Sequence, residues 1–503
     1  MQHHGAQRYN PELYNPRRTL GNECGPSSPD GRFGRLFALG GELQPHPSPI
    51  YDLRRLGRQN GPMLDDQGAV NDSATPAGFT FLAQFIDHDI TLDTSSKLDR
   101  PAVPRAVENS RTPNLDLDCV YGAGPEASPF LFDLPKLRVG QPIGGERFDL
   151  ARFDGIALIG DPRNDENVIV SQLQAAFIAF HNALADRLLA ARGVALNALS
   201  EQAKRELFEA ARDHVIHYYH RLLIEDFLPH IIGVERTIDI ARRGRRFYFK
   251  DGFYDGANDD VRRPFMPVEF SVAAYRFGHS QVRQTYDLNA ARLGVELFAA
   301  DGLMGFRPIA ETDRVDWHRF FAVDGRGAPQ MARKIDPLLP GHLFHLDEVN
   351  VVPPGDLGSL AARNLNRGRT FRLPSGQAIA RAMGETPLAA DETVREHLAI
   401  EETPLWYYVL QEASQVVVTA EGYLPKVKSM GHGREMGSAA GNVLGPVGGT
   451  IVGEVITGLI DHYRERTGKG LDFIPEIDLE TTDTGQFGQR FLMQNMLSAA
   501  SLT

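Results

Sequence analysis

Apolar residues recur every three or four positions over several long stretches of this chain, which is the spacing typical of amphipathic helices. In residues 165–190 the apolar stripe consists of Ile169, Leu173, Ala176, Phe177, Phe180, Leu184 and Leu188. The same analysis predicts further helices over 79–93, 203–226, 267–282, 375–384, 388–399, 405–413 and 446–465. The chain is therefore expected to be rich in helices that bury one face.

Strand signals are short and scattered, and the clearest is the segment RRFYF at 245–249. No alternation of strands and helices builds a parallel sheet. Residues 1–75 are rich in Pro, Gly, Asn and Asp and show little periodicity, which is typical of an extended arm lying on a larger body. We expect a mainly α fold: an N-terminal arm over 1–75, and one large helical domain over 76–503 with long loops and little β structure.

Composition narrows the classes of partner. The net charge of -12 and the pI of about 5.8 argue against nucleic acid or an anionic membrane as the main partner. The two cysteines, Cys24 and Cys119, cannot form a disulfide framework. The first residues lack the apolar core of a secretory signal, so a cytoplasmic or non-classically secreted protein is expected. The apolar segment 438–460 contains Pro446 and Glu454, which favours a buried helix starting near Pro446 over a membrane span.

Residues 79–93, FTFLAQFIDHDITLD, carry a histidine and carboxylates inside an apolar stretch. Burying Asp87, His88 and Asp89 would cost several kcal/mol unless each polar group found a partner. In a helix Gln84, Asp87 and His88 share one face, whereas Asp89 points elsewhere. One face could then serve a cofactor and the other a cation.

Three further segments place polar pairs at helical spacing. In GDPRNDE, 160–166, Asp161 is a plausible N-cap and Arg163 and Glu166 stand three apart; alone, this favours an exposed capping network with an ion pair. In AAYRFGHS Arg276 shares a face with His279, and a lone histidine on such a face is more often a core residue than a ligand. In ARNLNRGR Asn364 and Arg367 are also three apart, where a loop and helix cap is the simpler interpretation.

The segment RTPNLDLDCVYG, 111–122, has oxygen donors at alternate positions, namely Thr112, Asn114, Asp116 and Asp118. With Asp89 they could form a hard-cation site of the calcium type. Taken alone, the segment fits an exposed turn with solvated aspartates better than a cation site.

Together these motifs match, in order, the haem-binding elements of the animal haem peroxidase superfamily. The chain resembles the family that includes myeloperoxidase and lactoperoxidase, in a compact form similar to its bacterial members, from about residue 70 to near 455. The resemblance implies a haem peroxidase that reduces hydrogen peroxide through a ferryl intermediate and oxidises small organic donors or halides. It implies haem b and Ca²⁺ as cofactors.

The resemblance also assigns roles above the haem plane. His88 matches the distal histidine, which moves a proton between the two peroxide oxygens. Arg163 matches the distal arginine, whose fixed charge stabilises the breaking O–O bond. Gln84 matches the distal glutamine, which orders water and halide.

Below the haem plane, His279 matches the proximal ligand of the iron. Asn364 matches the residue that accepts the other N–H of this histidine. Arg276 and Arg367 match residues near the haem edge that could pair with propionates.

Asp87 and Glu166 align with the two carboxylates that form ester bonds to haem methyl groups in the mammalian enzymes. Asn167 stands where myeloperoxidase has its sulfonium-forming methionine, so no sulfonium link is expected. The segment around Asn114 matches the calcium loop of the family, in which this position gives a backbone carbonyl and Thr112 gives both hydroxyl and carbonyl. Asp118 replaces a serine of several members, which adds negative charge.

Two alternatives remain open. Fatty-acid dioxygenases of the cyclooxygenase and α-dioxygenase type share this fold and use a tyrosyl radical, and in cyclooxygenase the tyrosine lies three residues before the proximal histidine. That position is Arg276 here, and Tyr275 would point about 100° away on a regular helix; cyclooxygenases also lack the arginine that Arg163 supplies. A haem-bearing adhesion or matrix protein is the other alternative, although no adhesion module is visible in the sequence.

Overall fold

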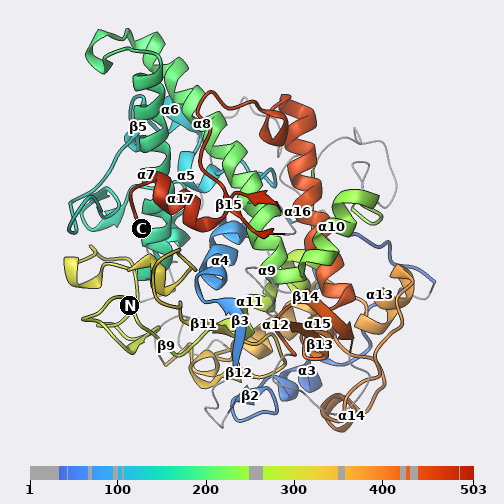
Figure 1. Ribbon diagram of the computed structural model, residues 1–503. Helices are drawn as coiled ribbons and strands as arrows, with labels where there is room; N and C mark the ends of the chain where they lie inside the picture. The colour runs from blue at the N-terminus through green and yellow to red at the C-terminus, as the bar shows by residue number, and fades with distance from the viewer. Residues whose placement is uncertain are drawn as a thin grey trace.

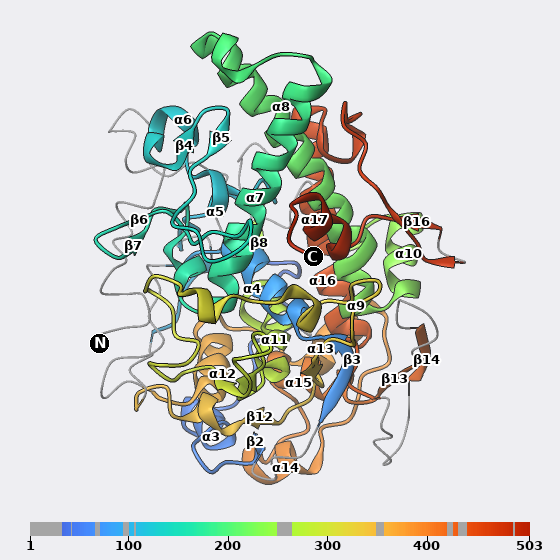
Figure 2. The same ribbon diagram turned by 60° about the vertical axis from the view of Figure 1, so that its left-hand side comes forward.

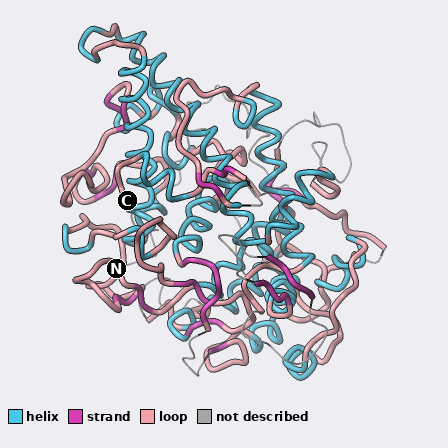
Figure 3. Tube along the Cα trace, in the orientation of Figure 1, coloured by secondary structure: helices cyan, strands magenta, loops and turns pink. Residues whose placement is uncertain are grey.

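The computed structural model describes residues 33–41, 43–65, 71–93, 100–104, 107–248, 264–348, 357–419, 426–430, 440–485 and 488–503. Its fold is mainly α, as the periodicity predicts, and the described strands pair only in twos (Figures 1 and 3). The helices are α3 Ile50–Leu56, α4 Gly78–Ile90, α5 Asp118–Tyr121, α6 Gly124–Ala127, α7 Val168–Ala191, α8 Glu201–Leu222, α9 Leu228–Ile232, α10 Val234–Arg243, α11 Gly278–Gln281, α12 Leu360–Thr370, α13 Gly376–Met383, α14 Glu392–Leu398, α15 Leu405–Ala413, α16 Pro446–Thr467 and α17 Met493–Ala499.

The strands are short, each of two to five residues. They are β1 Phe33–Gly34, β2 Leu64–Asp65, β3 Asp72–Pro76, β4 Phe132–Asp133, β5 Lys136–Leu137, β6 Arg152–Phe153, β7 Ile156–Ala157, β8 Met266–Pro267, β9 Thr285–Tyr286, β10 Val295–Glu296, β11 Met331–Arg333, β12 Leu339–Pro340, β13 Val416–Thr419, β14 Lys426–Met430, β15 Thr482–Asp483 and β16 Gln489–Arg490.

The core forms where α4 packs against α7 and α7 against α8 (Figure 2). Phe85 of α4 stacks on Phe177 of α7 with ring centroids 4.5 Å apart, and Tyr219 of α8 meets Phe177 edge on. Of the described helices, α7 alone has the length and hydropathy to cross a membrane, and 89% of its most apolar window is buried within the protein. The candidate at 438–460 contributes to α16, a buried helix that begins at Pro446 as predicted.

Side-chain caps decide where several predicted helices begin. The helix expected at 165–190 starts at Val168, because Asn167 accepts hydrogen bonds from the backbone N–H groups of Ile169 and Val170. The helix expected at 388–399 starts only at Glu392, after the cap Asp391. The α-helix expected at 203–226 ends at Leu222, and a π turn over Leu223–Phe227 follows it.

The continuous helix predicted over 267–282 is wrong. A π turn over Glu269–Ala273 is followed by a 3-10 turn over Ala274–Phe277 and then by α11. The break falls at Ala273, whose φ of -129° and ψ of -76° lie outside the helical region. Turns of this kind are frequent at functional sites.

The strand predicted at 245–249 is also wrong over its described part. Residues 246–248 form a bend, and residue 249 lies outside the described residues. The buried carboxylate of Glu454 accepts the backbone N–H groups of Phe247 and Tyr248 at 2.6 and 3.2 Å. These donors are therefore not available to a neighbouring strand.

The described residues of 33–41, 43–65 and 71–76 lie along the body. β1 pairs in parallel with β8, β2 in parallel with β12, and β3 antiparallel with β11. Helix α3 packs against α12 and α14. The boundary proposed at residue 75 falls within β3, and the division into an arm and a domain stays a prediction.

Glu412 of α15 caps a neighbouring helix. The N-cap of α16, Gly445, has no side chain, and the Glu412 carboxylate accepts the backbone N–H groups of Val447 and Gly448 at 3.0 and 3.2 Å. Burial raises the pKa of Glu412 to about 7, although these N–H groups act in the opposite direction.

We expect this carboxyl to make the chain less stable as the pH rises. Between about 4.5 and about 7 the folded chain keeps a proton that the unfolded chain has lost, so the free energy of unfolding falls across this window. Glu412→Gln should flatten that slope in urea titrations at several pH values. Glu126→Gln, on an exposed side chain, is the control and should keep the slope; equal slopes in both variants would contradict the assignment.

Candidate active site

The helix α4 brings four of the predicted site residues together. His88 and Asp89 are buried, and Gln84 and Asp87 are half-buried. The His88 ring is held at Nδ1 by Asn164 Oδ1 at 2.7 Å, and its Nε2 faces Glu166 Oε1 at 3.7 Å. Burial, followed by the Arg163 charge, lowers the pKa of His88. The imidazole is thus neutral near pH 7 and can act as a base.

Arg163 lies in a 3-10 turn over Pro162–Asp165 whose N-cap is Asp161. Its Nη2 donates to the carbonyl oxygens of His88 and Thr91 at 3.1 and 2.6 Å, and to Asp161 Oδ2 at 2.8 Å. Asp161 is fully buried and also pairs with Arg111 Nε at 2.9 Å. Burial alone would raise the pKa of Asp161, but the two guanidiniums bring it well below its usual value. The sequence alone favoured an exposed capping network at this position, but the structure has a buried ion cluster there instead.

Glu166 is fixed from two sides. Gln84 Nε2 donates to its Oε1, and Asn167 Nδ2 donates to Gln84 Oε1 at 3.2 Å. The backbone carbonyl of Glu166 accepts a hydrogen bond from Gly305 N at 2.9 Å. A Cβ on Gly305 would approach the carbonyl oxygen of Asp165 to 1.8 Å, so only glycine allows this contact.

On the other side, His279 stands on α11 and Asn364 on α12, with Asn364 Nδ2 2.7 Å from His279 Nδ1. Arg276 Nη1 donates to Asn364 Oδ1 at 3.1 Å. This orientation differs from the expectation that Asn364 accepts a proton from the ring, because Arg276 already occupies the amide oxygen. Burial, with the Arg276 charge next, lowers the pKa of His279 to about 3.

The two histidines belong to elements that touch, since α11 packs against α4. The charge of Glu166 acts on both rings, raising the pKa of each against the effect of burial. The structure thus brings the predicted distal and proximal residues to one place.

Arg276 and Arg367 form a positive cluster next to this site. Burial, followed by the charge of Arg367, lowers the pKa of Arg276 to about 10. Burial also lowers the pKa of Arg367, whose Nη1 lies 3.4 Å from Asp93 Oδ2. Two repelling guanidiniums in a dry setting favour the binding of anions. The loop and helix cap considered for Asn364 and Arg367 is wrong, because both lie within α12.

Tyr275 is buried and lies close enough to Asp87 for the charge of this carboxylate to act on its hydroxyl. Its ring stacks on Phe270 at 4.5 Å, and its buried hydroxyl has no hydrogen-bond partner. Burial, followed by the charge of Asp87, raises the pKa of Tyr275. The rotation of about 100° per residue holds for an α-helix; in the 3-10 turn where Tyr275 stands it is about 120°, so Tyr275 does not take the position of Arg276. Asp87 itself accepts from Thr91 Oγ1 at 2.8 Å.

The candidate cation segment is buried rather than an exposed turn. Thr112 Oγ1 donates to Asp116 and Asp118, both at 3.2 Å, and burial followed by the charges of Asp118 and Asp116 raises the pKa of Asp89. Asn114 Oδ1 is buried without a hydrogen-bond partner. Within the ranges that the structure describes, no three His, Cys, Asp or Glu side chains are arranged as metal ligands.

The backbone of this segment is strained. Leu115 and Leu117 have φ values of 52° and 59°, in the left-handed region that branched residues rarely adopt. Both side chains are fully buried, and His220 Nε2 meets the carbonyl oxygen of Leu115 at 2.9 Å. Core packing therefore holds the segment in its shape.

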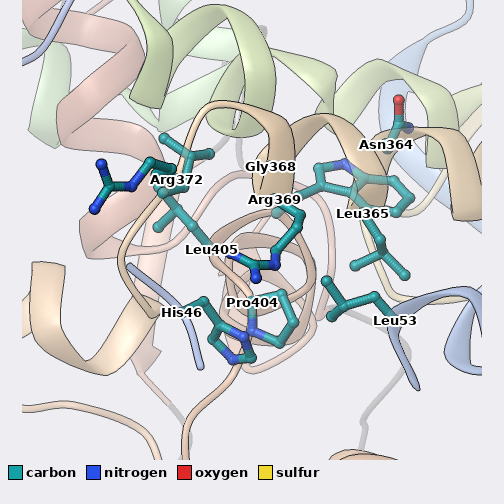
Figure 4. Close-up of a pocket in the computed structure, with 11 residues that line it drawn as sticks. His46, Leu53, Asn364, Leu365, Gly368, Arg369, Arg372, Pro404 and Leu405 are labelled. Carbon is teal, nitrogen blue, oxygen red and sulfur yellow. The ribbon is translucent and has the colours of Figure 1, made fainter. Parts of the chain in front are cut away.

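A recess behind Asn364 is lined by His46, Leu53, Leu365, Arg369 and Leu405 among others (Figure 4). It lies between α12, α15 and the N-terminal segment, and neither His88 nor His279 lines it. Asn364, which contacts His279, also lines the recess, so the recess adjoins the proximal side of the site.

Sequence reasoning missed three residues that hold this site: Asn164, Gln174 and Arg111. Each is fully buried and polar. Gln174 lies in an apolar helix, and such a position is the signal that could have found it. Asn164 directly follows Arg163 in a turn, and no feature of the sequence distinguishes it there.

Comparison with known proteins places the chain in a family. Residues 84–399 match the family model "Animal haem peroxidase", and the chain belongs to this family. It is 31% identical over 292 residues to chorion peroxidase of Drosophila melanogaster, covering 55% of this chain and 34% of that protein. It is 22% identical over 273 residues to peroxinectin A of Dictyostelium discoideum, covering 51% and 42%. The chain thus spans less than half the length of these curated relatives.

Solved structures agree on the fold. Peroxidase A from Dictyostelium discoideum superposes with a TM-score of 0.55 at 16% identity, covering 86% of this chain and 88% of that one. A fatty acid alpha-dioxygenase from Arabidopsis thaliana superposes with a TM-score of 0.53 at 16% identity, covering 98% and 80%. At such identities the likeness concerns the fold alone.

We expect Asp161→Asn to destabilise the protein strongly. The change leaves Arg111 buried without its closest countercharge, and removing one partner of a buried ion pair costs about 3–5 kcal/mol. The free energy of unfolding from urea titration measures this cost. Asp186→Asn, which breaks an exposed pair with Lys136, is the control and should cost about 0–1 kcal/mol. A cost for Asp161→Asn as small as the control would contradict the assigned role.

Proposed function

We propose that this chain is a haem peroxidase that reduces hydrogen peroxide and oxidises small organic donors or halides. One observation carries the proposal: each of two histidines is held at Nδ1 by an asparagine, 2.7 Å away in both cases. Nε2 of His88 faces Glu166, and Nε2 of His279 makes no hydrogen bond with a described residue. An iron porphyrin needs one such nitrogen as ligand and another as base.

The residues present fit haem b. An added Cβ at Gly278, next to His279, would meet nothing within 4 Å, so the space beside this backbone is open. Arg276 and Arg367 are a matched pair of cations for two propionates. Bound through His279, the iron would supply the two-electron reduction of peroxide. Asp87 and Glu166 stand close enough to His88 to influence its pKa, and we propose them as the residues that would form ester links.

The distal residues would divide the proton chemistry. His88 Nε2 would take the proton from the first peroxide oxygen and return it to the leaving oxygen, so no proton is lost to solvent. Arg163 would stabilise the charge that develops as the O–O bond breaks. Gln84, held by Glu166 and Asn167, would orient water or halide nearby.

Ligation would change the proximal hydrogen bonds. A neutral imidazole that gives Nε2 to iron keeps its proton on Nδ1, so Asn364 must turn its amide oxygen toward the ring. That turn releases Arg276 Nη1 from Asn364 Oδ1. The released guanidinium is then available to a propionate.

We also propose Ca²⁺ at Asp89, Thr112, Asn114, Asp116 and Asp118. Asp89 and Asp118 are buried carboxylates whose pKa values burial and neighbouring acidic groups raise, that of Asp118 to about 6. A divalent cation would offset this repulsion. Asp89 directly follows His88, so the cation would anchor the distal helix.

Replacing the two histidines should give different phenotypes. His279→Ala should abolish the Soret absorbance, because the iron loses its ligand; intact absorbance would show that another residue binds the iron.

His88→Ala should keep haem but react with peroxide about 10²- to 10⁴-fold more slowly, which is the usual contribution of a positioned acid or base. Stopped-flow spectra test the second variant, and wild-type rates would contradict the role of His88. Acid-acetone extraction of the wild type shows how much haem is ester-linked.

Removing calcium should disturb the distal side. Chelator-treated protein is expected to lose bound metal by elemental analysis, to unfold at a lower temperature and to react more slowly with peroxide. Calcium should restore all three properties. Asp89→Asn should mimic chelation, and a metal-free protein with full activity and stability would leave the segment without a cation.

A fatty-acid dioxygenase is the second candidate, favoured by the likeness to alpha-dioxygenase structures and by the position of Tyr275 near Asp87. Arg163 and the arginine three residues before His279 argue against it. Guaiacol oxidation with peroxide supports the peroxidase. Oxygen uptake with linoleate that Tyr275→Phe abolishes would support the dioxygenase.

A further inference from the structure

The backbone carbonyl of Cys119 is the end point of a buried chain of side chains. It accepts a hydrogen bond from Gln174 Nε2 at 3.3 Å. A carbonyl oxygen can only accept, so this contact fixes the orientation of the Gln174 amide: nitrogen toward Cys119 and oxygen away from it. Gln174 is fully buried, and water does not offer it another partner.

Two further contacts fix the orientations of the Asn164 amide and the His88 ring in turn. Gln174 Oε1 can only accept, and it takes a hydrogen bond from Asn164 Nδ2 at 2.8 Å. The amide oxygen of Asn164 is therefore the atom that faces His88 Nδ1, at 2.7 Å. Because that oxygen also can only accept, Nδ1 of His88 must carry the proton. Nε2 is left as the unprotonated nitrogen.

We propose that Asn164 and Gln174 are positioning residues that set the tautomer and ring orientation of His88, with the Cys119 carbonyl as their reference point. This inference rests on the proposed function. The base required for peroxide cleavage is an unprotonated Nε2, and a ring free to flip or exchange tautomers would present it only part of the time. The chain of hydrogen bonds keeps it present at all times.

The same carbonyl also positions Arg163. It accepts from Asp161 N at 3.2 Å, and the Asp161 carboxylate binds Arg163. Gly160 allows this approach, because a Cβ there would meet the carbonyl oxygens of Asp118 and Cys119 at 2.4 and 2.6 Å. A single peptide within the candidate cation segment thus aligns both distal groups.

The first test measures the tautomer in the full chain without haem. Protein labelled with ¹⁵N-histidine gives imidazole signals that distinguish Nδ1–H from Nε2–H, and His88→Gln identifies the signal of His88. We expect the Nδ1–H form in the wild type and a mixture of both forms in Asn164→Leu, which has a similar shape but no acceptor. A dominant Nε2–H form in the wild type would overturn the proposal.

The second test measures the peroxide reaction of haem-loaded protein by stopped flow. Asn164→Leu should slow it about 10- to 100-fold with unchanged haem content, since a misplaced catalytic imidazole loses orders of magnitude in rate. Gln174→Met, which frees the Asn164 amide, should have a smaller effect of about 3- to 10-fold. Asn164→Asp keeps an acceptor for Nδ1 and should restore most of the rate.

Asn182→Ala is the matched control. Asn182 lies on the same helix as Gln174 and bonds to the backbone of Leu137 at 2.8 and 3.0 Å, so its loss is only structural. Rates within twofold of the wild type in both Asn164→Leu and the control would overturn the proposal. A wild type with the Nδ1–H tautomer but no peroxide reaction would refute the proposed function and leave the tautomer assignment standing.

Discussion

The pairing of one buried carboxylate with two guanidiniums organises this molecule. Asp161 is fully buried between Arg111 and Arg163. Arg111 also reaches Asp118 and the carbonyl oxygen of Gly160. These contacts join the segment before α5 to the turn before α7. Since α4 packs into the same region, the positions of His88 and Arg163 follow from this cluster.

Several polar groups in and beside the apolar helix α4 are tolerated because they find partners from another element. His88 bonds to Asn164, Gln84 bonds to Glu166 and Asn167, and Arg163 donates to the carbonyl oxygens of His88 in α4 and of Thr91, which directly follows α4. Such a network has one arrangement that satisfies all donors and acceptors. These hydrogen bonds thus fix the side chains around His88 before any substrate arrives, which favours catalysis by fixed charges and dipoles.

The sequence predicts the long helices well, because α7, α8 and α16 each bury an apolar stripe with the helical period. It also identifies the residues around both histidines through the resemblance of four ordered motifs. The broken helix at 269–277 could not be predicted, because the segment VEFSVAAYRF is too short for its apolar pattern to distinguish the periods of α, π and 3-10 turns. The bend at 246–248 could not be predicted either. Its backbone N–H groups donate to the carboxylate of Glu454, which is more than two hundred residues away in the sequence. The partners of His88 depend on tertiary contacts, and no local pattern marks them.

The left-handed leucines at 115 and 117 have a consequence for any ion that binds between them. Left-handed backbone costs about 1–2 kcal/mol per residue, and the burial of two leucine side chains offsets that amount. The backbone of the candidate cation segment is thus shaped by the packing of its own leucines. A cation arriving there would order little new chain, so most of its binding free energy would appear as affinity.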